Sequence, residues 1–306
     1  MDAALRFVDV VKRYGRRGTL ALDGLTFEVP ANGITGFVGH NGAGKTTAFS
    51  LVSGFLHADA GTIDILGEGP FEPHRLKGRL GVLPQDAELP DRHTPRELLR
   101  HLARLQGLDR ATAASETDRV LDVVQLGPRR DARIATLSHG MRRRVAVASA
   151  LVGRPALVLL DEPMSGLDPV QAHGLREALA ALRGEQTLVV SSHDLSELER
   201  LSDHVVMLKD GRCVRQGPVA EVTGQGAEVR WALGPGEVPL EALAAQLPEH
   251  RFHLEGDVLV QHAPDGALDT SSVAVMGALA AAGVPVRGVR RGRGLEQRFI
   301  DDVLGR

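Results

Sequence analysis

The chain of 306 residues is 43% hydrophobic and 25% charged, a balance typical of a soluble globular protein with room for one large or two modest domains. Its formal net charge of −3 gives no general reason to expect nucleic acid or an anionic membrane as a partner. Cys213 is the only cysteine, which excludes an intrachain disulfide and a cluster of thiolate metal ligands and suits a reducing cytoplasm.

The sequence predicts neither a secretory signal nor a membrane span. Residues Met1 to Arg6 lack a basic segment followed by an apolar one. The best apolar runs, Val145 to Val152 and Ala156 to Leu160, fall short of the roughly 20 residues that a spanning helix needs. Any role at a membrane is therefore expected to depend on a partner protein.

Strands and turns are expected up to about Asp86, and they lead into a glycine-rich loop. Ile34 to Val38 is a short β-rich run, and Thr46 to Gly54 has the composition of a helix. The loop between them consists of Gly39, His40, Asn41, Gly42, Ala43, Gly44, Lys45 and Thr46. This strand–loop–helix context predicts a site for a nucleoside triphosphate, and it argues against a glycine-rich turn that contains Lys and Thr by chance.

The chemistry of phosphate binding accounts for the residue types in the loop. Glycines let the backbone N–H groups turn inward around the β-phosphate, and the following helix adds the partial positive charge of its N-terminus. Lys45 is expected to bridge the β- and γ-phosphates, and the Thr46 hydroxyl is expected to bind Mg²⁺. Thr47 is expected to add a contact to the α-phosphate.

The stretch from about Ala87 to Thr136 is expected to be helical because its leucines recur at helical spacing. Two buried parallel strands are then expected, at Ala156 to Leu160 and at Thr187 to Ser191.

The first of these two strands runs directly into Asp161 and Glu162. The carboxyl ends of parallel strands form the ligand-binding edge of an open α/β sheet. At that edge Asp161 can hold Mg²⁺ through water, and Glu162 can act as general base toward the attacking water. An acidic pair after a strand is often only a solvated turn, but the phosphate loop earlier in the chain favours the functional interpretation.

Beyond Pro218 the pattern changes to that of a small α+β domain with its own core. A polar link at Thr223 to Gly226 is followed by alternating runs at Glu228 to Ala232, Arg251 to His262 and Val286 to Arg290. Helices are expected at Leu240 to Leu247, Ser271 to Ala282 and Leu295 to Leu304.

Over about residues 4 to 218 the chain resembles the nucleotide-binding subunits of ATP-binding cassette (ABC) transporters. The segments that match, in the order of that family, are Lys12 to Gly15, the phosphate loop, Leu83 to Asp86, Leu137 to Met141, Leu157 to Glu162, Ser165 to Asp168 and Ser191 to Asp194.

The resemblance implies a role for one residue in each of the shorter segments. Tyr14 would stack on adenine, and His193 would contact the γ-phosphate. Gln85 would sense Mg²⁺ and the γ-phosphate and face the membrane partner, whereas Asp168 would lie in a loop that crosses a dimer interface. Taken singly, these residues could be a surface aromatic, a structural histidine, a solvated amide and a helix cap before a proline.

The segment Leu137 to Met141 departs from the commonest form of the family's signature motif, Leu-Ser-Gly-Gly-Gln. His139 replaces the first glycine of the pair and Met141 the glutamine, whereas Ser138 and Gly140 remain. These two residues supply the hydroxyl and the close backbone approach that bind a γ-phosphate at a helix N-terminus. The variant is similar to type-2 ABC exporters of drugs, antibiotics and lipid-linked glycans, and this subclass is the one that the resemblance implies.

In this family two subunits pair head to tail, so that Ser138 of one would close over the ATP held by Lys45 of the other. The implied activity is hydrolysis of ATP with Mg²⁺ held at Thr46, Gln85 and Asp161, which drives opening and closing of the dimer. The implied partners are a second copy or a paired ATPase subunit, together with an integral-membrane permease on a separate chain. The subunit would lie in the cytoplasm at the inner face of the cell membrane.

The implied fold is an α/β P-loop ATPase core with a mixed, largely parallel sheet, an N-terminal antiparallel β subdomain and a helical subdomain at about residues 87–136. Residues 1–220 would form this ABC ATPase domain. Residues 225–306 would form a small α+β accessory domain, similar to the C-terminal extension of many type-2 exporter ATPases.

Two other functions fit parts of this pattern. A soluble, non-transport ABC ATPase could act on ribosomes or DNA, but such relatives carry two cassettes or a long coiled coil, and this chain has neither. A regulator that binds ATP without turnover is disfavoured by the presence of Glu162, Gln85 and His193. The basic runs at Arg142 to Arg144 and Arg287 to Arg293 are interpreted as solvated or phosphate-proximal faces, so no nucleic acid is expected as a partner.

Overall fold

The structure is a computed structural model that describes residues 3–15, 18–224, 228–264 and 267–304. Met1 and Asp2 of the N-terminal segment, and Gln225 and Gly226 of the predicted link, lie outside the described residues. The chain divides into two compact units, Met1–Gln216 and Gly217–Arg306. In the described part of the chain, no helix combines the length and the apolar composition that crossing a membrane requires.

A three-stranded antiparallel sheet begins the first unit. Its order is β2 (Leu20–Pro30), β1 (Ala3–Arg13) and β4 (Ala60–Ile65). Phe7 of β1 lies opposite Phe27 of β2 and Ile63 of β4. In β2, buried Leu25, Phe27 and Val29 alternate with exposed residues, so one face of this sheet packs on the core and the other meets water.

The second sheet of this unit has six strands and is parallel from β5 to β8. Its order is β5 (Leu80–Leu83), β6 (Leu157–Leu160), β7 (Thr187–Ser191), β3 (Ile34–Gly39), β8 (His204–Lys209) and β9 (Arg212–Pro218). Strand β6 is completely buried, as expected for a parallel strand covered on both faces. Asp210 and Gly211 join β8 to β9 with positive φ at both positions, the geometry of a tight hairpin turn.

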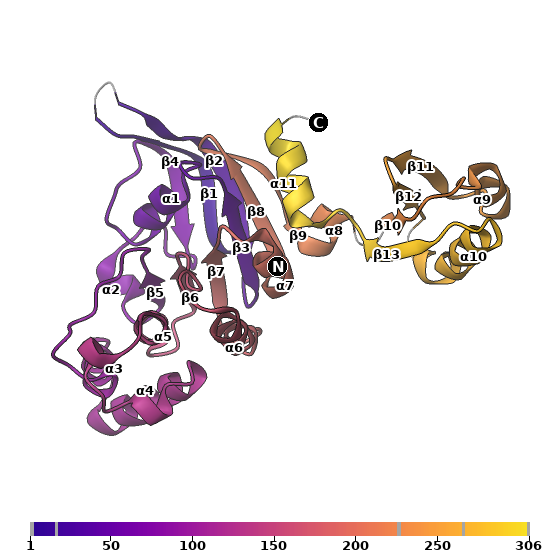
Figure 1. Ribbon diagram of the computed structural model, residues 1–306. Coiled ribbons are helices and arrows are strands. Elements are labelled where there is room, and N and C mark those ends of the chain that lie inside the picture. Colours follow the sequence, from indigo (N-terminus) through magenta and orange to yellow (C-terminus); the bar gives the residue numbers. More distant parts are fainter. Residues whose placement is uncertain (1–2, 16–17, 225–227, 265–266, 305–306) are drawn as a thin grey trace. The chain divides into compact units, whose positions relative to one another are not determined.

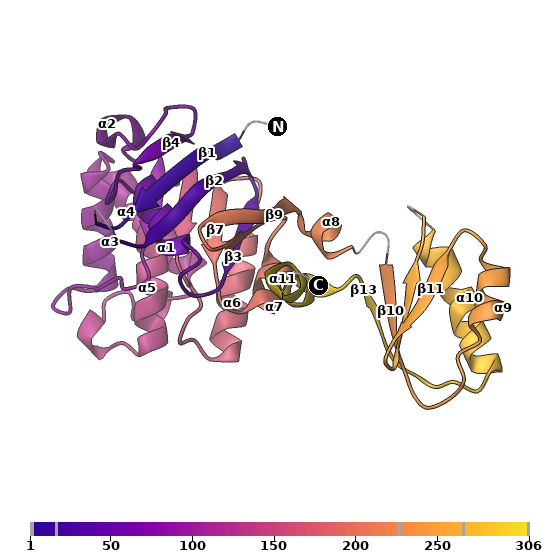
Figure 2. The same cartoon turned by 90° about the horizontal axis from the view of Figure 1, so that it is seen from above.

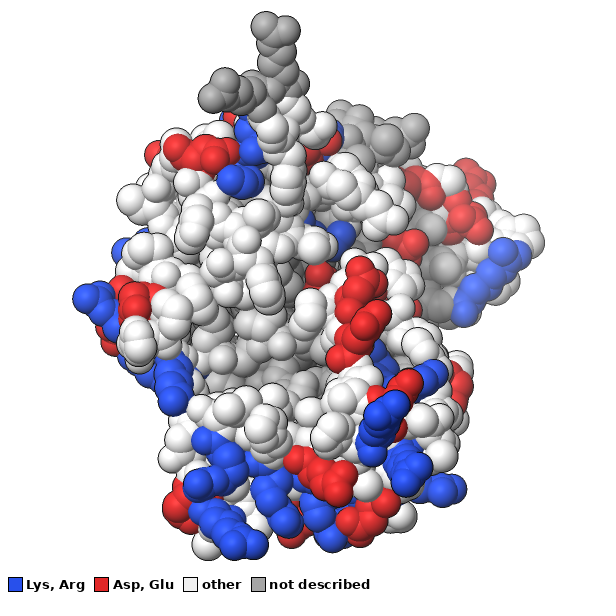
Figure 3. Space-filling view, turned by 90° about the vertical axis from the view of Figure 1, so that its left-hand side faces the viewer, with Lys and Arg blue, Asp and Glu red and all other residues white. Residues whose placement is uncertain are grey.

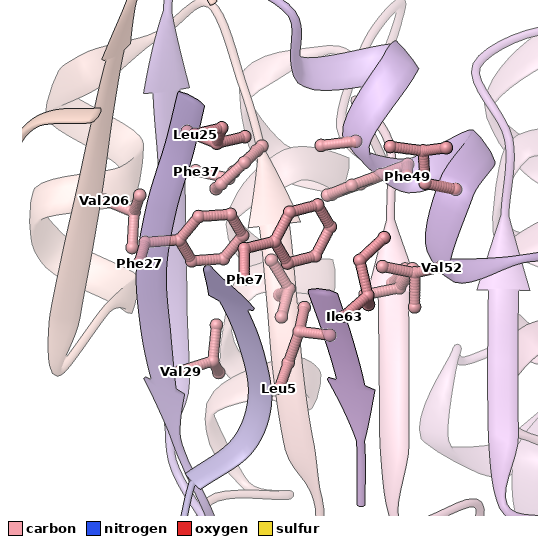
Figure 4. Packing of buried hydrophobic residues seen from close by; sticks show 14 of the residues in the cluster. Leu5, Phe7, Leu25, Phe27, Val29, Phe37, Phe49, Val52, Ile63 and Val206 are labelled. Carbon is pink, nitrogen blue, oxygen red and sulfur yellow. The ribbon is translucent and has the colours of Figure 1, made fainter. Parts of the chain in front are cut away.

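A row of aromatic rings packs between the two sheets (Figure 4). The ring centroids of Phe7 and Phe27 are 4.6 Å apart, those of Phe27 and Phe37 5.3 Å, and those of Phe37 and Phe49 5.5 Å. Phe37 belongs to β3 and Phe49 to α1 (Lys45–Val52), so this core fixes the strand and the helix on either side of the glycine-rich loop.

Helices cover the other face of the six-stranded sheet. Figure 2 shows β1 and β2 on one side of that sheet and α5 (His139–Leu151) and α6 (Pro169–Ala180) on the other. Helix α5 contacts β5 and β6, and α7 (Leu195–Leu201) contacts β3. The short helix α2 (Pro73–Leu76) precedes β5.

The stretch predicted to be helical contains α3 (Pro95–Leu105) and α4 (Arg110–Val123), which pack together at the lower left of Figure 1. Two short 3₁₀ turns follow, η1 (Gly127–Arg129) and η2 (Ile134–Thr136). The first helix begins at Pro95 and not near Ala87, because Thr94 and Glu97 form a capping box there. At the height of these helices, basic side chains gather on the face seen in Figure 3, whereas its centre is largely uncharged.

The second unit has its own core. Four antiparallel strands lie in the order β11 (Arg251–Glu255), β12 (Val258–His262), β10 (Glu228–Leu233) and β13 (Val286–Arg291). Its helices are α8 (Val219–Thr223), α9 (Leu240–Gln246), α10 (Leu268–Ala281) and α11 (Gly294–Leu304). Fully buried Trp231 packs with Leu259, Val275 and Leu279, and its indole N–H donates to Gln261 Oε1 at 3.2 Å.

The predicted fold class is therefore confirmed: a P-loop α/β core with an antiparallel N-terminal sheet, a helical insertion and a small C-terminal α+β unit.

Candidate nucleotide-binding and catalytic site

The glycine-rich loop joins β3 to α1 at the carboxyl edge of the parallel strands. Gly42 and Gly44 have φ values of 86° and 107°, a left-handed backbone that glycine adopts without strain. A Cβ atom on Gly44 would lie 2.6 Å from Leu22 Cδ2 and 2.9 Å from the carbonyl oxygen of Ala21. Both the conformation and the close approach of β2 therefore require glycine at position 44.

Lys45 opens α1 and turns its ammonium group back over the loop. Its Nζ donates to the carbonyl oxygens of Gly39 at 2.5 Å and His40 at 3.3 Å. Burial lowers the pKa of Lys45, and the carboxylates of Glu162 and Asp161 act in the opposite direction. The loop thus presents a half-buried cation close to two carboxylates.

Asp161 directly follows β6 and is only 2% exposed. Its Oδ2 accepts from the Thr46 hydroxyl at 3.3 Å, and its Oδ1 accepts from the Ser191 hydroxyl at 2.5 Å. Burial raises the pKa of Asp161, whereas the hydrogen bonds from Ser191 and Thr46 lower it. A carboxylate beside a hydroxyl on the edge of a phosphate site is a donor set that suits a hard cation such as Mg²⁺.

Glu162 adopts a strained backbone, with a positive φ of 52°. Its N–H donates to Ser191 Oγ at 2.9 Å, and its Oε2 lies 2.7 Å from Nδ1 of His193. The side chain of Glu162 is 14% exposed and that of His193 is 73% exposed. Ser191 thus fixes the backbone of Glu162, and a carboxylate beside an open imidazole can accept a proton from water.

One cavity of about 460 Å³ gathers most of the predicted residues. The residues of the predicted site that line it are Tyr14, Asn41, Gly42, Gly44, Lys45, Thr46, Thr47, Gln85, Asp161 and Glu162. Tyr14 is 47% exposed, and its hydroxyl lies 3.2 Å from Thr47 Oγ1, so its ring borders this cavity beside α1. Gly39, His40 and Ala43 shape the turn without lining the cavity.

Three predicted residues lie away from this cavity, at the N-termini of two helices. Ser138 caps α5, its Oγ accepting from the N–H of Met141 at 3.2 Å, and Asp168 caps α6 by accepting from Val170 and Gln171. Buried Gly140 allows these two helix ends to approach closely, because a Cβ at this position would lie 2.4 Å from Gln171 Oε1. Within a single chain, the structure therefore does not bring Ser138, Gly140 and Asp168 to the loop cavity.

Two residues of the site were not predicted from the sequence. Ser191 contacts both Asp161 and Glu162, and the only signal for it was its position at the end of an apolar strand, just before His193. Arg143 was predicted to lie on a solvated or phosphate-proximal helix face. Its side chain is not fully solvated: it turns inward and donates to backbone carbonyls next to the carboxylates, which agrees with the phosphate-proximal alternative and was not predicted as a contact.

Comparison with known proteins gives consistent matches. A protein family described as ABC transporter matches residues 22–165. Nod factor export ATP-binding protein I of Burkholderia orbicola (strain AU 1054) is 36% identical over 262 residues, which cover 84% of this chain and 85% of that protein.

Solved structures agree with this match. A structure described as the ATP binding subunit of an ABC transporter is 28% identical, with a TM-score of 0.65. The aligned region covers 72% of this chain and 92% of that one. A bacterial Atm1-family ABC exporter with ATP bound is also 28% identical, with a TM-score of 0.64 over 72% of this chain and 39% of that one.

Proposed function

Because the chain belongs to the ABC transporter family of ATP-binding proteins and is an ATPase, we propose that it powers export through a separate membrane permease. The observation that carries the ATP-driven part of this proposal is the cavity in which Lys45, Asp161 and Glu162 meet. The similarity to a protein named for Nod factor export supports export as the direction of transport.

The loop cavity would hold ATP with its triphosphate over α1. Backbone N–H groups of the loop and the Lys45 ammonium would bind the β- and γ-phosphates, and Thr47 would contact the α-phosphate. The half-exposed ring of Tyr14, beside the same cavity, would stack on adenine.

Mg²⁺ would be held by the Thr46 hydroxyl, by Asp161 and by Gln85, whose side chain borders the cavity. When bound, the ion supplies positive charge that offsets the charge developing on the phosphate oxygens. Glu162 would take a proton from the attacking water, and His193 would orient the Glu162 carboxylate and contact the γ-phosphate.

A second subunit would complete each site. Ser138, Gly140 and Asp168 lie at helix N-termini outside the loop cavity of their own chain, and a helix N-terminus binds phosphate well. In a head-to-tail homodimer, or with a paired ATPase subunit, they would close over ATP held by the other chain. Hydrolysis would release this contact and open the dimer.

The membrane partner would be a permease on a separate chain, and the subunit would lie at the cytoplasmic face of the membrane through that partner. The exported substrate would be drug-like, antibiotic or lipid-linked, as the type-2 form of the signature motif suggests. Substrate choice would rest with the permease.

Purification of the tagged protein from detergent-solubilised membranes tests this proposal. The expected result is ATP-dependent phosphate release together with a stoichiometric integral-membrane companion. Copurification with ribosomal proteins or DNA, and no membrane companion, would overturn the assignment to export.

A further inference from the structure

Arg143 lies in α5 and binds three backbone carbonyls of the catalytic site. Its NH1 donates to the carbonyl oxygen of Gln85 at 3.0 Å. Its NH2 donates to the carbonyl oxygens of Asp161 at 2.5 Å and Glu162 at 2.8 Å. One guanidinium group therefore connects the loop after β5, the end of β6 and the helix that Ser138 caps.

These bonds act on the strained backbone of Glu162. Its N–H donates to Ser191 and its carbonyl oxygen accepts from Arg143. Hydrogen bonds to distant residues therefore fix the peptide groups on both sides of Glu162. A residue with φ of 52° persists only where its surroundings fix it, and the direction of the Glu162 carboxylate depends on that backbone. Arg143 is thus one of the groups that fix the backbone of Glu162, together with Ser191 and with the N–H of Ser165, which donates to the same carbonyl oxygen at 3.1 Å.

The chemistry of arginine suits this task. A guanidinium group is planar, presents five N–H donors in a fixed arrangement and stays protonated in proteins. Burial lowers the pKa of Arg143, whereas the Asp161 and Glu162 carboxylates act in the opposite direction. A lysine has one nitrogen on a flexible stem, so it cannot reach three carbonyls with the same geometry.

The first turn of α5 also packs closely against the segment that precedes α6. A Cβ on Gly166 would lie 2.6 Å from Nε2 of His139, the residue that departs from the commonest signature motif. Helix α5 therefore carries Ser138 at its N-terminus, His139 against Gly166 and Arg143 against the carboxylates. A shift of α5 moves all three together.

We propose that Arg143 is a positioning residue that holds Glu162 and Gln85 in the geometry for hydrolysis and ties them to the helix carrying Ser138. This inference rests on the proposed function, in which Glu162 and Gln85 act at the γ-phosphate. Arg143 does not line the loop cavity that would hold the nucleotide. Its loss should therefore slow the chemical step and leave ATP binding by the loop nearly intact.

The test compares Arg143→Met, Arg143→Lys and the wild type by steady-state phosphate release and by equilibrium binding of ATP. For Arg143→Met we expect kcat to fall about 10- to 100-fold, since small misplacements of a catalytic group cost rates of this order. The dissociation constant for ATP should change less than about threefold, a shift of under 1 kcal/mol. Arg143→Lys should recover part of kcat.

The control is Arg100→Met, which removes an exposed arginine of α3 and should leave kcat unchanged. Wild-type kcat in folded Arg143→Met, or parallel loss of kcat and ATP affinity, would overturn the inference. Should Arg143→Met fail to fold, Arg143→Lys decides alone: reduced kcat with unchanged affinity supports the inference, and wild-type kcat rejects it.

Glu162→Gln, measured alongside, separates this inference from the proposed function. Normal hydrolysis in Glu162→Gln would reject the catalytic assignment itself. Lost hydrolysis in Glu162→Gln with normal hydrolysis in Arg143→Met would reject only the role of Arg143.

Discussion

Nδ1 of His193 lies 2.7 Å from Oε2 of Glu162, so a single hydrogen bond joins the end of β7 to the carboxylate that follows β6. The imidazole is open to solvent, whereas the carboxylate is mostly covered. In the proposed function, this pair supplies the general base and the group that orients it.

Glu162→Gln removes the proton acceptor and leaves the shape of the site intact. We expect kcat to fall at least about 10²-fold, the contribution of a general base, while ATP still binds. Phosphate release and sedimentation with ATP are the measurements, and ATP should trap a dimer. Glu249→Gln, an exposed position of the second unit, is the matched control. An unchanged rate in Glu162→Gln would show that another group takes the proton.

Lys45→Ala removes the half-buried ammonium group of the loop. We expect ATP affinity to fall at least about tenfold, since hydrogen bonds to charged groups contribute about 1.5–3 kcal/mol. Titration calorimetry with ATP measures this loss. The exposed Lys77→Ala serves as control and should bind normally. Equal affinity in the two variants would contradict the phosphate role of Lys45.

Ser191→Ala removes the hydroxyl that donates to Asp161 and accepts from the N–H of Glu162. The Ser191 hydrogen bond lowers the pKa of Asp161, so its loss lets burial raise that pKa further. Because the ionised carboxylate is the form that holds a cation, the acidic limb of the kcat/KM profile should move to higher pH. Activity near neutral pH should fall about tenfold.

The readout for Ser191→Ala is the pH profile of phosphate release at saturating Mg²⁺. Ser115→Ala, exposed on α4, is the control and should leave the profile in place. If the acidic limb does not move in Ser191→Ala, the Ser191 hydroxyl does not control the pKa of Asp161.

The second unit should lose stability in acid through Glu255. Its pKa is lowered from 4.5 to about 2, chiefly by the hydrogen bond from Arg230, with His253 and Arg293 adding to the effect. The folded state therefore binds fewer protons than the unfolded state across this window. The stabilisation that Glu255 contributes is complete above pH 4.5 and is lost as the pH falls toward about 2.

Trp231 provides the measurement, because it is the only tryptophan and lies fully buried in the core of this unit. Urea unfolding followed by its fluorescence should show stability falling between about pH 5 and about pH 2 in the wild type, and a shallower fall in Arg230→Met. Arg287→Met, whose exposed side chain is paired more distantly with Asp257, should keep the wild-type slope. Equal slopes in wild type and Arg230→Met would rule out this ion pair as the cause.

Residue patterns along the chain were enough to predict the glycine-rich loop, the carboxylates at Asp161 and Glu162, and most elements of the C-terminal unit. The reason is that each depends on neighbours in sequence: glycines with positive φ before a helix, an apolar run ending in acids, and alternating patterns of fixed period. The predicted run Arg251 to His262 is two strands, β11 and β12, and helix α8 was not predicted. The start of the first helix at Pro95 was missed, because the leucines with helical spacing all follow Pro95 and the capping box of Thr94 and Glu97 fixes where the helix begins.

Only the tertiary structure decided which distant groups surround those motifs. Ser191 reaches Asp161 because β6 and β7 are adjacent parallel strands, a pairing that no local pattern in either strand specifies. Arg143 appeared in the sequence as part of a basic run, and the packing of α5 against β5 and β6 turned it toward the carbonyls of Gln85, Asp161 and Glu162. The sequence determined by itself which chemical groups are present and where the loop bends, because those depend on residue type and local conformation. The tertiary structure determined what holds these groups in place, because that depends on contacts between residues far apart in the chain.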